Sequence, residues 1–173
     1  MHALVDYARY QDLRVLYAFN SRYRSRCLDV IMHGATQMVV PAVILLLLWF
    51  IWSKDPELGA VSRSTSLILI SVNLGVILFK SIIRRPRPCH AQDDIIAVHP
   101  PSTKSSFPSG HTSNAFSIAL SLGYYYPHFM VPLLFLALLV GVSRIYLGAH
   151  YPSDVLGGLA VAASVYGFIL LIL

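Results

Sequence analysis

The most apolar run of this chain is LDVIMHGATQMVVPAVILLLLWFIW, residues 28–52. It carries a single carboxylate at its start and ends in a cluster of aromatic residues. About 20 apolar residues in a helix cross the hydrocarbon core of a bilayer, and this run is long enough to do so. It therefore predicts a membrane-spanning helix.

Four more stretches have the length of a span. The third of the resulting five starts with the polar residues PSGHTSN, so hydropathy alone would miss it. Pro41 and Pro132 fall inside spans, where neighbouring helices can satisfy the freed backbone groups. We expect an all-α fold, an integral membrane bundle of five transmembrane helices, at about residues 28–52, 65–83, 108–126, 129–147 and 152–173.

Composition agrees with a membrane protein of one domain. The 173 residues are 56% hydrophobic and 12% charged, with a mean hydropathy of +0.64. Soluble domains carry about 25% charged residues. The formal net charge of +5 would suit nucleic acid, anionic lipid or a phosphorylated substrate. We predict no nucleic-acid partner, because no soluble basic domain is present to bind one, and no obligate protein partner is evident.

Two segments outside the spans carry much of the charge. Residues 1–27 mix Leu, Val, Tyr and Phe with Asp and Arg, which favours an amphipathic helix lying at the membrane interface. The sequence RYRSR at 22–26 suits anionic headgroups or serves as a topology signal, two alternatives of equal weight. Residues 84–107 form a long polar loop rich in proline, and such loops are usually functional or disordered.

Three separated clusters combine residues suited to phosphate chemistry. They are Lys80 with Arg87-Pro88, then Pro108-Ser109-Gly110-His111, then Ser143-Arg144 with His150 and Asp154. Each lies at the end of a predicted span or in the 84–107 loop. With spans of alternating direction, all of them fall on the same membrane face. Independent placement would rarely achieve this, so we expect one shared site.

The cations of these clusters indicate an anionic ligand. Lys80, Arg87 and Arg144 lie near span ends, where charge is costly and tends to mark function. Arginine matches two phosphate oxygens, and converging cations stabilise a phosphoryl group in transfer. For Arg84, Arg85 and Lys104 we favour the simpler interpretation, in which the side chains extend to lipid headgroups.

The two histidine clusters each open a predicted helix. Free N–H groups at a helix start bind anions, Gly110 permits close approach of a ligand, and Ser109 can donate to phosphate. His111 in the first turn is a candidate general acid. Asp154 can reach back to His150 and leave the other ring nitrogen free to attack, or it can cap its helix, or both. Mid-span Asn73 is expected to make an interhelical hydrogen bond.

Together the clusters resemble the three-part signature of the type-2 phosphatidic-acid phosphatase superfamily, the lipid phosphate phosphatases. The resemblance covers residues 80–154, and no signature position is substituted. Asn20 followed by Leu28-Asp29 is a weaker match to the start of the family's first core span.

The resemblance implies a role for each residue. His150 is the expected nucleophile, oriented by Asp154, and His111 the acid that protonates the leaving alkoxide and then activates water. The expected phosphate ligands are Lys80, Arg87, Ser109, Gly110 and Arg144, with Ser143 as a lesser phosphate or packing contact. The family needs no metal or other cofactor, and the sequence contains no carboxylate cluster for magnesium and no Cys/His set for zinc.

The implied activity is hydrolysis of a phosphomonoester or pyrophosphate of a membrane lipid, either a phospholipid or a glycolipid. The basic N-terminal segment favours a bulky anionic headgroup. This ranks lipid A 1-phosphate and phosphatidylglycerophosphate ahead of undecaprenyl pyrophosphate and phosphatidic acid. Two alternatives stay open: transfer of the phosphoryl group to another lipid, and an anion-binding membrane protein without turnover.

Two arguments predict opposite membrane sides for the site. The basic residues gather on the same face as the three clusters, and the positive-inside rule would place that face in the cytoplasm. Bacterial members of the resembled family work at the outer face of the inner membrane. Charges that bind phosphate or headgroups weaken the rule, so we expect a bacterial inner-membrane protein with an extracytoplasmic site.

Overall fold

The structure is a computed structural model that describes residues 2–38, 56–97 and 103–172, with single positions 44, 47, 49, 50 and 54 between the first two ranges. These residues are helical, apart from loops and one isolated antiparallel bridge between Pro86 and Ser105. The α-helices are α1 (His2–Tyr17), α2 (Arg26–Gln37), α4 (Pro56–Ile83), α5 (Pro88–Ala91), α6 (Gly110–Tyr125), α7 (Met130–Tyr146) and α8 (Pro152–Leu170). A π-helix (Ala18–Arg22) follows α1, and a 3-10 turn (Pro127–Phe129) precedes α7.

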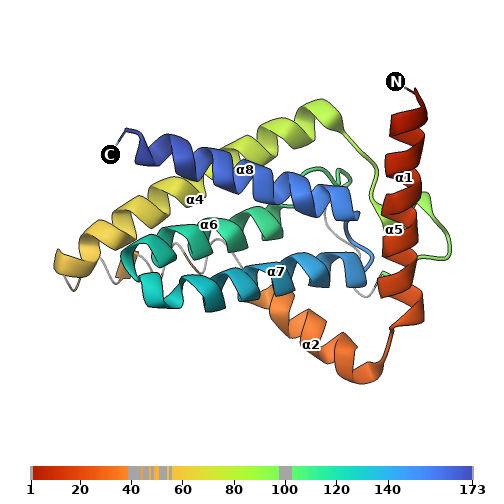
Figure 1. Cartoon of the computed structure of the whole chain (residues 1–173), viewed down its shortest axis with the longest axis horizontal. Helices are drawn as coiled ribbons and strands as arrows, with labels where there is room; N and C mark the ends of the chain where they lie inside the picture. The colour runs from red at the N-terminus through yellow and green to blue at the C-terminus, as the bar shows by residue number, and fades with distance from the viewer. Residues whose placement is uncertain are drawn as a thin grey trace.

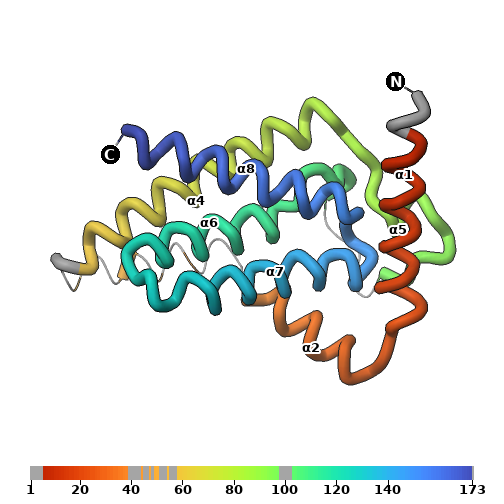
Figure 2. Tube along the Cα trace, in the orientation of Figure 1, coloured from red at the N-terminus to blue at the C-terminus, as the bar shows by residue number. Residues whose placement is uncertain are grey.

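Helices α4, α6, α7 and α8 run side by side, and α1 crosses one end of this bundle (Figure 1). The C-terminus lies at the opposite end from α1 (Figure 2). Helix α6 is central, since it contacts α4, α7 and α8. A cluster of small and apolar side chains fills the space between α6, α7 and α8, including Ala115, Ala119, Ala137 and Ala162. Small residues allow helices to approach closely in a membrane.

Polar side chains on α6 are buried and hydrogen-bonded. Ser113 and Ser117 each donate to the backbone carbonyl four residues earlier, Ser121 pairs with Thr65, and Asn73 donates to Asn114 at 2.9 Å. The last of these confirms the interhelical bond expected of Asn73. Because these polar groups face neighbouring helices and not lipid, α6 can be buried without being uniformly apolar.

Three helical segments are long and apolar enough to cross a membrane: Leu58–Ile83, Pro127–Tyr146 and Pro152–Leu170. They correspond to the second, fourth and fifth predicted spans, and the protein is an integral membrane protein. The third predicted span is α6, which has 16 residues. Of the first, the start is α2, and most of the remainder falls outside the described residues. Five spans, the domain boundaries and the interfacial position of residues 1–27 stay predictions.

A prediction follows from the contact between α8 and the start of α6. A Cβ at Gly158 would lie 2.7 Å from the backbone oxygen of Ser109, and overpacking of this kind typically costs about 1–3 kcal/mol. Gly158→Ala should therefore lower the thermal unfolding midpoint of the detergent-solubilised protein. The matched control is Gly167→Ala on the same helix, where a Cβ meets nothing within 4 Å. Equal midpoints for the two variants would contradict this role of Gly158.

Candidate active site

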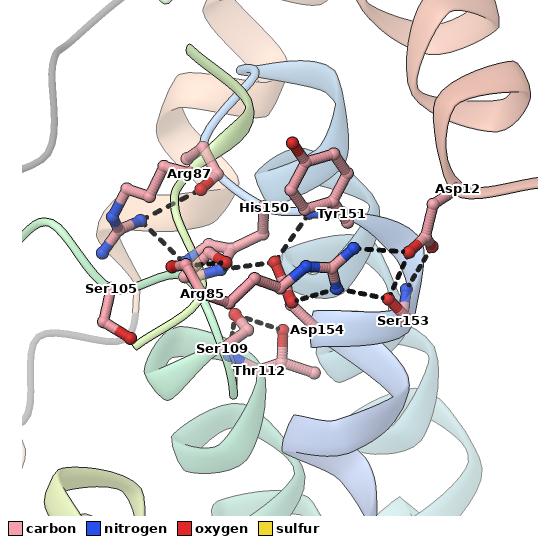
Figure 3. A network of polar contacts seen from close by, with 12 residues as sticks. Asp12, Arg85, Arg87, Ser105, Ser109, Thr112, His150, Tyr151, Ser153 and Asp154 are labelled. Carbon is pink, nitrogen blue, oxygen red and sulfur yellow. Dashed lines mark hydrogen bonds and ion pairs between the residues drawn. The ribbon is translucent and has the colours of Figure 1, made fainter. Parts of the chain in front are cut away.

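The candidate site lies at the end of the bundle that α1 crosses, where α4 and α7 end and α6 and α8 begin. Figure 3 shows Arg87, Ser109, His150 and Asp154 brought together there from three different segments. The backbone N–H of Ser109 donates to the carbonyl oxygen of Asp154 at 3.0 Å, which joins the second cluster directly to the third. The structure thus gathers residues that are distant in sequence around one point.

His150 occupies the tight connection between α7 and α8. The backbone N–H groups of Ala149 and His150 both donate to the carbonyl of Arg144, at 3.1 and 3.2 Å, and Gly148 takes a φ of +70°. This left-handed conformation favours glycine. The turn packs closely as well, because a Cβ at Gly148 would lie 2.7 Å from Ile95. The connection therefore fixes the histidine backbone, and its side chain is 2% exposed.

The two ring nitrogens of His150 face groups of opposite charge. Nη1 of Arg87 lies 3.0 Å from Nε2, and because a guanidinium only donates, Nε2 is the acceptor. Nδ1 lies 3.6 Å from Oδ2 of Asp154, a close contact that is longer than a hydrogen bond. We infer that Nδ1 carries the proton of the neutral ring and that Nε2 carries the free lone pair.

Electrostatics keep this histidine neutral at ordinary pH. Burial lowers the pKa of His150 to about 3, and the charges of Arg87 and Arg144 act in the same direction, whereas Asp154 opposes them. A pKa far below 7 leaves the ring unprotonated. A neutral imidazole with an available lone pair is the state that a nucleophile requires.

Asp154 is completely buried and holds its carboxylate with two hydrogen bonds. Oδ2 accepts from the backbone N–H of Tyr151 at 2.9 Å, as part of a capping box at the start of α8, and Oδ1 accepts from Nη1 of Arg85 at 2.8 Å. The same Oδ2 faces His150. Asp154 therefore caps its helix and also lies beside His150, and its role as the partner of that histidine in catalysis stays a prediction.

Lys80 and Arg87 both donate hydrogen bonds to residues 103–105, near the end of the 84–107 loop. Nζ of Lys80 donates to the carbonyl of Ser105 at 2.8 Å. Arg87 donates to the carbonyl and hydroxyl of Thr103, at 2.6 and 2.8 Å, and to the carbonyl of Ala149 at 3.0 Å. Burial lowers the pKa of the Arg87 guanidinium, which reflects the cost of holding this charge away from water.

Arg144 and Ser143 end α7 beside the same site. Nη1 of Arg144 donates to the hydroxyl of Thr36 on α2, and its buried Nε has no hydrogen-bond partner among the described residues. A buried charged donor without a partner is unfavourable, so an anion at this point would be stabilised. Ser143 donates to the carbonyl of Val140 at 2.6 Å within its own helix, a geometry that favours its packing alternative.

Ser109, Gly110 and His111 form the start of α6. The Ser109 hydroxyl is the N-cap and accepts from the N–H of Thr112 at 3.4 Å and from its hydroxyl at 2.9 Å. Gly110 begins the helix, and His111 is partly buried in its first turn. His111 lies within Coulombic range of Arg144, Arg87 and Lys80. All three cations therefore act on the first turn of α6, and a helix N-terminus itself favours an anion.

Comparison with known proteins identifies the family. Residues 63–173 match the family model of the PAP2 superfamily. The chain belongs to the PAP2 superfamily. This confirms the resemblance drawn from the three clusters, all of which lie inside the matched region.

Relatives of this PAP2 protein act on lipid phosphates. Undecaprenyl-diphosphatase BcrC of Bacillus subtilis is 33% identical over 152 residues, which cover 85% of this chain and 75% of that protein. A lipid A 1-phosphatase of Rhizobium johnstonii is 37% identical over 90 residues, which cover 50% of this chain and 37% of that protein.

Two solved structures share the fold. The crystal structure of Aquifex aeolicus LpxE matches with a TM-score of 0.80 and 29% identity, over 91% of this chain and 93% of that one. The PAP2-type phosphatidylglycerolphosphate phosphatase of Bacillus subtilis matches with a TM-score of 0.79 over 95% of this chain and 85% of that one. At 24% identity, the second likeness shows the fold alone.

One interpretation of the sequence is wrong for Arg85. It was expected to extend to lipid headgroups, but its guanidinium binds Asp154 and Asp12 at 2.8 Å each. The physical reason is that two buried carboxylates offer stronger partners than exposed headgroups. The sequence contains a local signal for this contact. Arg85-Pro86-Arg87-Pro88 favours an extended backbone, and residues two apart in an extended chain point to the same side, so Arg85 is expected on the same side as Arg87.

Other contacts of the PAP2 site come from segments that carry no recognisable motif. Thr36 holds Arg144, Thr103 holds Arg87, and Asp12 holds Arg85. Asn20, the weaker family match, is fully buried and joins the loop at Ile96 to the end of α7 at Tyr146. No pattern in the sequence identifies these pairings, because each joins residues from separate elements.

Metal ligands were not expected in this PAP2 protein. In the part of the chain that the structure describes, no three His, Cys, Asp or Glu side chains are grouped to hold a metal ion. Metal independence stays a prediction, to be tested by activity.

Proposed function

We propose that this membrane lipid phosphatase works through a phosphohistidine formed on Nε2 of His150. The observation that carries the proposal is the setting of this ring, with Asp154 on the Nδ1 side and Arg87 on the Nε2 side. The guanidinium of Arg87 lies in front of the lone pair. A bound phosphate would take over the hydrogen bonds of Arg87 and bring phosphorus to Nε2.

Phosphate binding is assigned to the groups around this point. Lys80, Arg87 and Arg144 supply positive charge, and Ser109 with the N–H groups that begin at Gly110 supplies donors at the helix start. Ser143 serves mainly to pack the end of α7. The unpartnered Nε of Arg144 supports this assignment, because a phosphate oxygen would satisfy it. Fixed cations of this kind stabilise the charge of a phosphoryl group as it transfers.

The first step joins His150 to phosphorus. Nε2 attacks, the bond between phosphorus and the lipid oxygen breaks, and His111, protonated for this step, gives its proton to the leaving oxygen. The ring of His150 gains positive charge as the P–N bond forms, and the carboxylate of Asp154 opposite Nδ1 stabilises it.

The second step releases phosphate by hydrolysis. His111, now neutral, takes a proton from water, and the oxygen of that water attacks phosphorus. The P–N bond breaks, its electron pair returns to His150, and inorganic phosphate leaves. One histidine thus acts first as acid and then as base, as microscopic reversibility requires.

The proposed substrate is a phosphomonoester or pyrophosphate at the head of a bulky membrane lipid. Relatives of the chain are named as phosphatases of undecaprenyl diphosphate, lipid A 1-phosphate and phosphatidylglycerophosphate. A panel of these lipids together with phosphatidic acid, assayed for release of inorganic phosphate, would rank them. Appearance of the phosphate on a second lipid would support transfer to an acceptor instead of hydrolysis.

The histidine assignments are tested by substitution. His150→Ala should abolish turnover while phosphate binding largely persists, since loss of a nucleophile commonly costs about four to six orders of magnitude in rate. His111→Ala should slow both departure of the lipid and hydrolysis of the intermediate. Phosphate release is measured with the best lipid of the panel. Substantial activity in His150→Ala would refute the nucleophile.

Metal independence is tested by chelation. Activity should survive EDTA, because the proposed chemistry uses only cationic side chains, a histidine nucleophile and an acid. Vanadate should inhibit, since it adopts the five-coordinate geometry of the transferring phosphorus. The assay is phosphate release from the same lipid before and after chelator. Loss of activity in EDTA with recovery on adding magnesium would contradict the mechanism.

Orientation is tested by fusing reporters after Leu173. We propose that the site faces the extracytoplasmic side of a bacterial inner membrane. The C-terminus, at the other end of the bundle from α1 (Figure 2), should then be cytoplasmic. A GFP fusion should fluoresce, and a matched alkaline phosphatase fusion should be inactive. The reverse pair of results would place the site in the cytoplasm, as the distribution of basic residues favours.

A further inference from the structure

A partly exposed arginine joins two buried carboxylates, one on α1 and the other facing His150. Nη2 of Arg85 donates to Oδ2 of Asp12 at 2.8 Å, and Nη1 of the same guanidinium donates to Oδ1 of Asp154 at 2.8 Å. Asp12 is 6% exposed and Asp154 is fully buried. Figure 3 shows Arg85 lying between the two carboxylates. The arginine therefore bridges two acidic groups, one at the site and one on the crossing helix.

The guanidinium of Arg85 is oriented from several sides. Its centre lies 4.0 Å from the ring centroid of Tyr151, and Nη1 also donates to the hydroxyl of Ser153 at 2.7 Å. Burial lowers the pKa of Arg85, but hydrogen bonds to Asp12 and the charges of both carboxylates outweigh burial and leave the pKa above its ordinary value. Arg85 therefore stays protonated, and its planar guanidinium fixes the relative geometry of its hydrogen bonds to the two carboxylates.

This bridge constrains how Asp154 faces the histidine. Oδ1 of Asp154 is bound by Arg85 and Oδ2 by the N–H of Tyr151, which leaves Oδ2 directed at Nδ1 of His150. Without Arg85, the carboxylate would keep the hydrogen bond from the N–H of Tyr151 but lose the one on Oδ1 that helps to fix its rotation. It would also face the charge of Asp12 with no cation between them. Both effects would weaken its support of the positive charge that develops on His150.

We propose that Asp12 and Arg85 are positioning residues, in which Asp12 orients Arg85 and Arg85 orients Asp154 behind the nucleophile. Helix α1 thereby belongs to the reaction machinery. Asp12 lies before residue 63, where the match to the PAP2 superfamily begins, so the family assignment does not supply this role. The inference rests on the proposed roles of His150 and Asp154.

Asp12 also makes contacts that would give it a purely structural role, distinct from positioning Arg85. Its Oδ1 accepts from the backbone N–H of Ser153 at 2.9 Å, and its Oδ2 accepts from the Ser153 hydroxyl. Asp12 therefore also caps the start of α8. Asp12→Asn is the informative change, because the amide oxygen can keep the bond from the Ser153 N–H while the charge toward Arg85 is lost.

The test is a double-mutant cycle in the full-length, detergent-solubilised enzyme, with Asp12→Asn, Arg85→Gln and the pair. Residues that orient metal ligands from behind contribute about ten- to a hundredfold, and by analogy we expect each single change to lower kcat by such a factor. KM should change little, because neither residue is assigned to the phosphate. In the Arg85→Gln background, Asp12→Asn should cause no further loss of kcat, since its effect passes through Arg85.

Two matched controls accompany the cycle. Asp6→Asn removes an exposed carboxylate from the same helix, and Arg84→Gln removes the neighbouring exposed arginine; both should leave kcat and KM as in the parent. Size-exclusion profiles and thermal midpoints report folding. If Arg85→Gln does not fold, Arg85→Lys replaces it in the cycle, because lysine keeps the charge but cannot bridge both carboxylates with one fork.

The outcomes separate this inference from the proposed function. The positioning role would be overturned if the losses of kcat in the two single variants multiply in the double variant, or if Asp12→Asn leaves kcat unchanged. Either result could occur while His150→Ala remains inactive, so the proposed function would stand. Substantial activity in His150→Ala would instead overturn the proposed function, whatever the cycle gives. A loss confined to KM would assign Asp12 and Arg85 to substrate binding, and a loss confined to the thermal midpoint would assign them to structure alone; either would overturn the positioning role.

Discussion

The charged end of the bundle depends on the buried carboxylate of Asp154. Its side chain accepts from Arg85 and from the N–H of Tyr151 and faces His150, while its backbone carbonyl accepts from Ser109. One residue thus joins the extended segment after α4, the start of α6 and the start of α8. A buried carboxylate is tolerated only when it is paired and hydrogen-bonded. That requirement forces these segments into one arrangement.

The cations around Asp154 suit the phosphate that we propose as their ligand. Lys80, Arg87 and Arg144 lie within Coulombic range of one another, and the carboxylate that acts on Lys80 and Arg87 is that of Asp154. Backbone carbonyls and threonine hydroxyls hold Lys80 and Arg87, and a threonine hydroxyl holds Arg144, so their charges are solvated but not neutralised. An incoming phosphate would complete the balance. On the proposed function, substrate binding would therefore offset the cost of assembling these charges.

The packing of α6 against α4 and α8 fixes the position of its first turn, which carries part of the site. Its buried serines bond within the helix, and Asn114 and Ser121 bond to α4. Gly158 of α8 lets the backbone of Ser109 approach closely. Polar pairing and close helix contact resist sliding of one helix along another. The start of α6 is accordingly held against α8 at the point where Ser109 and Asp154 meet.

The membrane class, the long apolar helices and the three clusters follow from the sequence alone. Lys80, His111, Arg144 and His150 could be placed at one end of the bundle because apolar runs predict spans and consecutive spans alternate in direction. The sequence also places the start of α8 at Pro152, because proline suits the first turn of a helix. The third predicted span starts at residue 108, two residues before α6 begins at Gly110.

Only the tertiary structure decided which distant groups pair. Arg85 with Asp12, Arg144 with Thr36, and Asn20 with Ile96 and Tyr146 are contacts between separate elements. No periodicity or spacing encodes them, and an arginine beside a span end looks the same whether it meets lipid or carboxylate. Hydropathy determines that a segment enters the membrane, whereas the partner of a buried charge is determined by whichever opposite group the packed helices bring within hydrogen-bond distance.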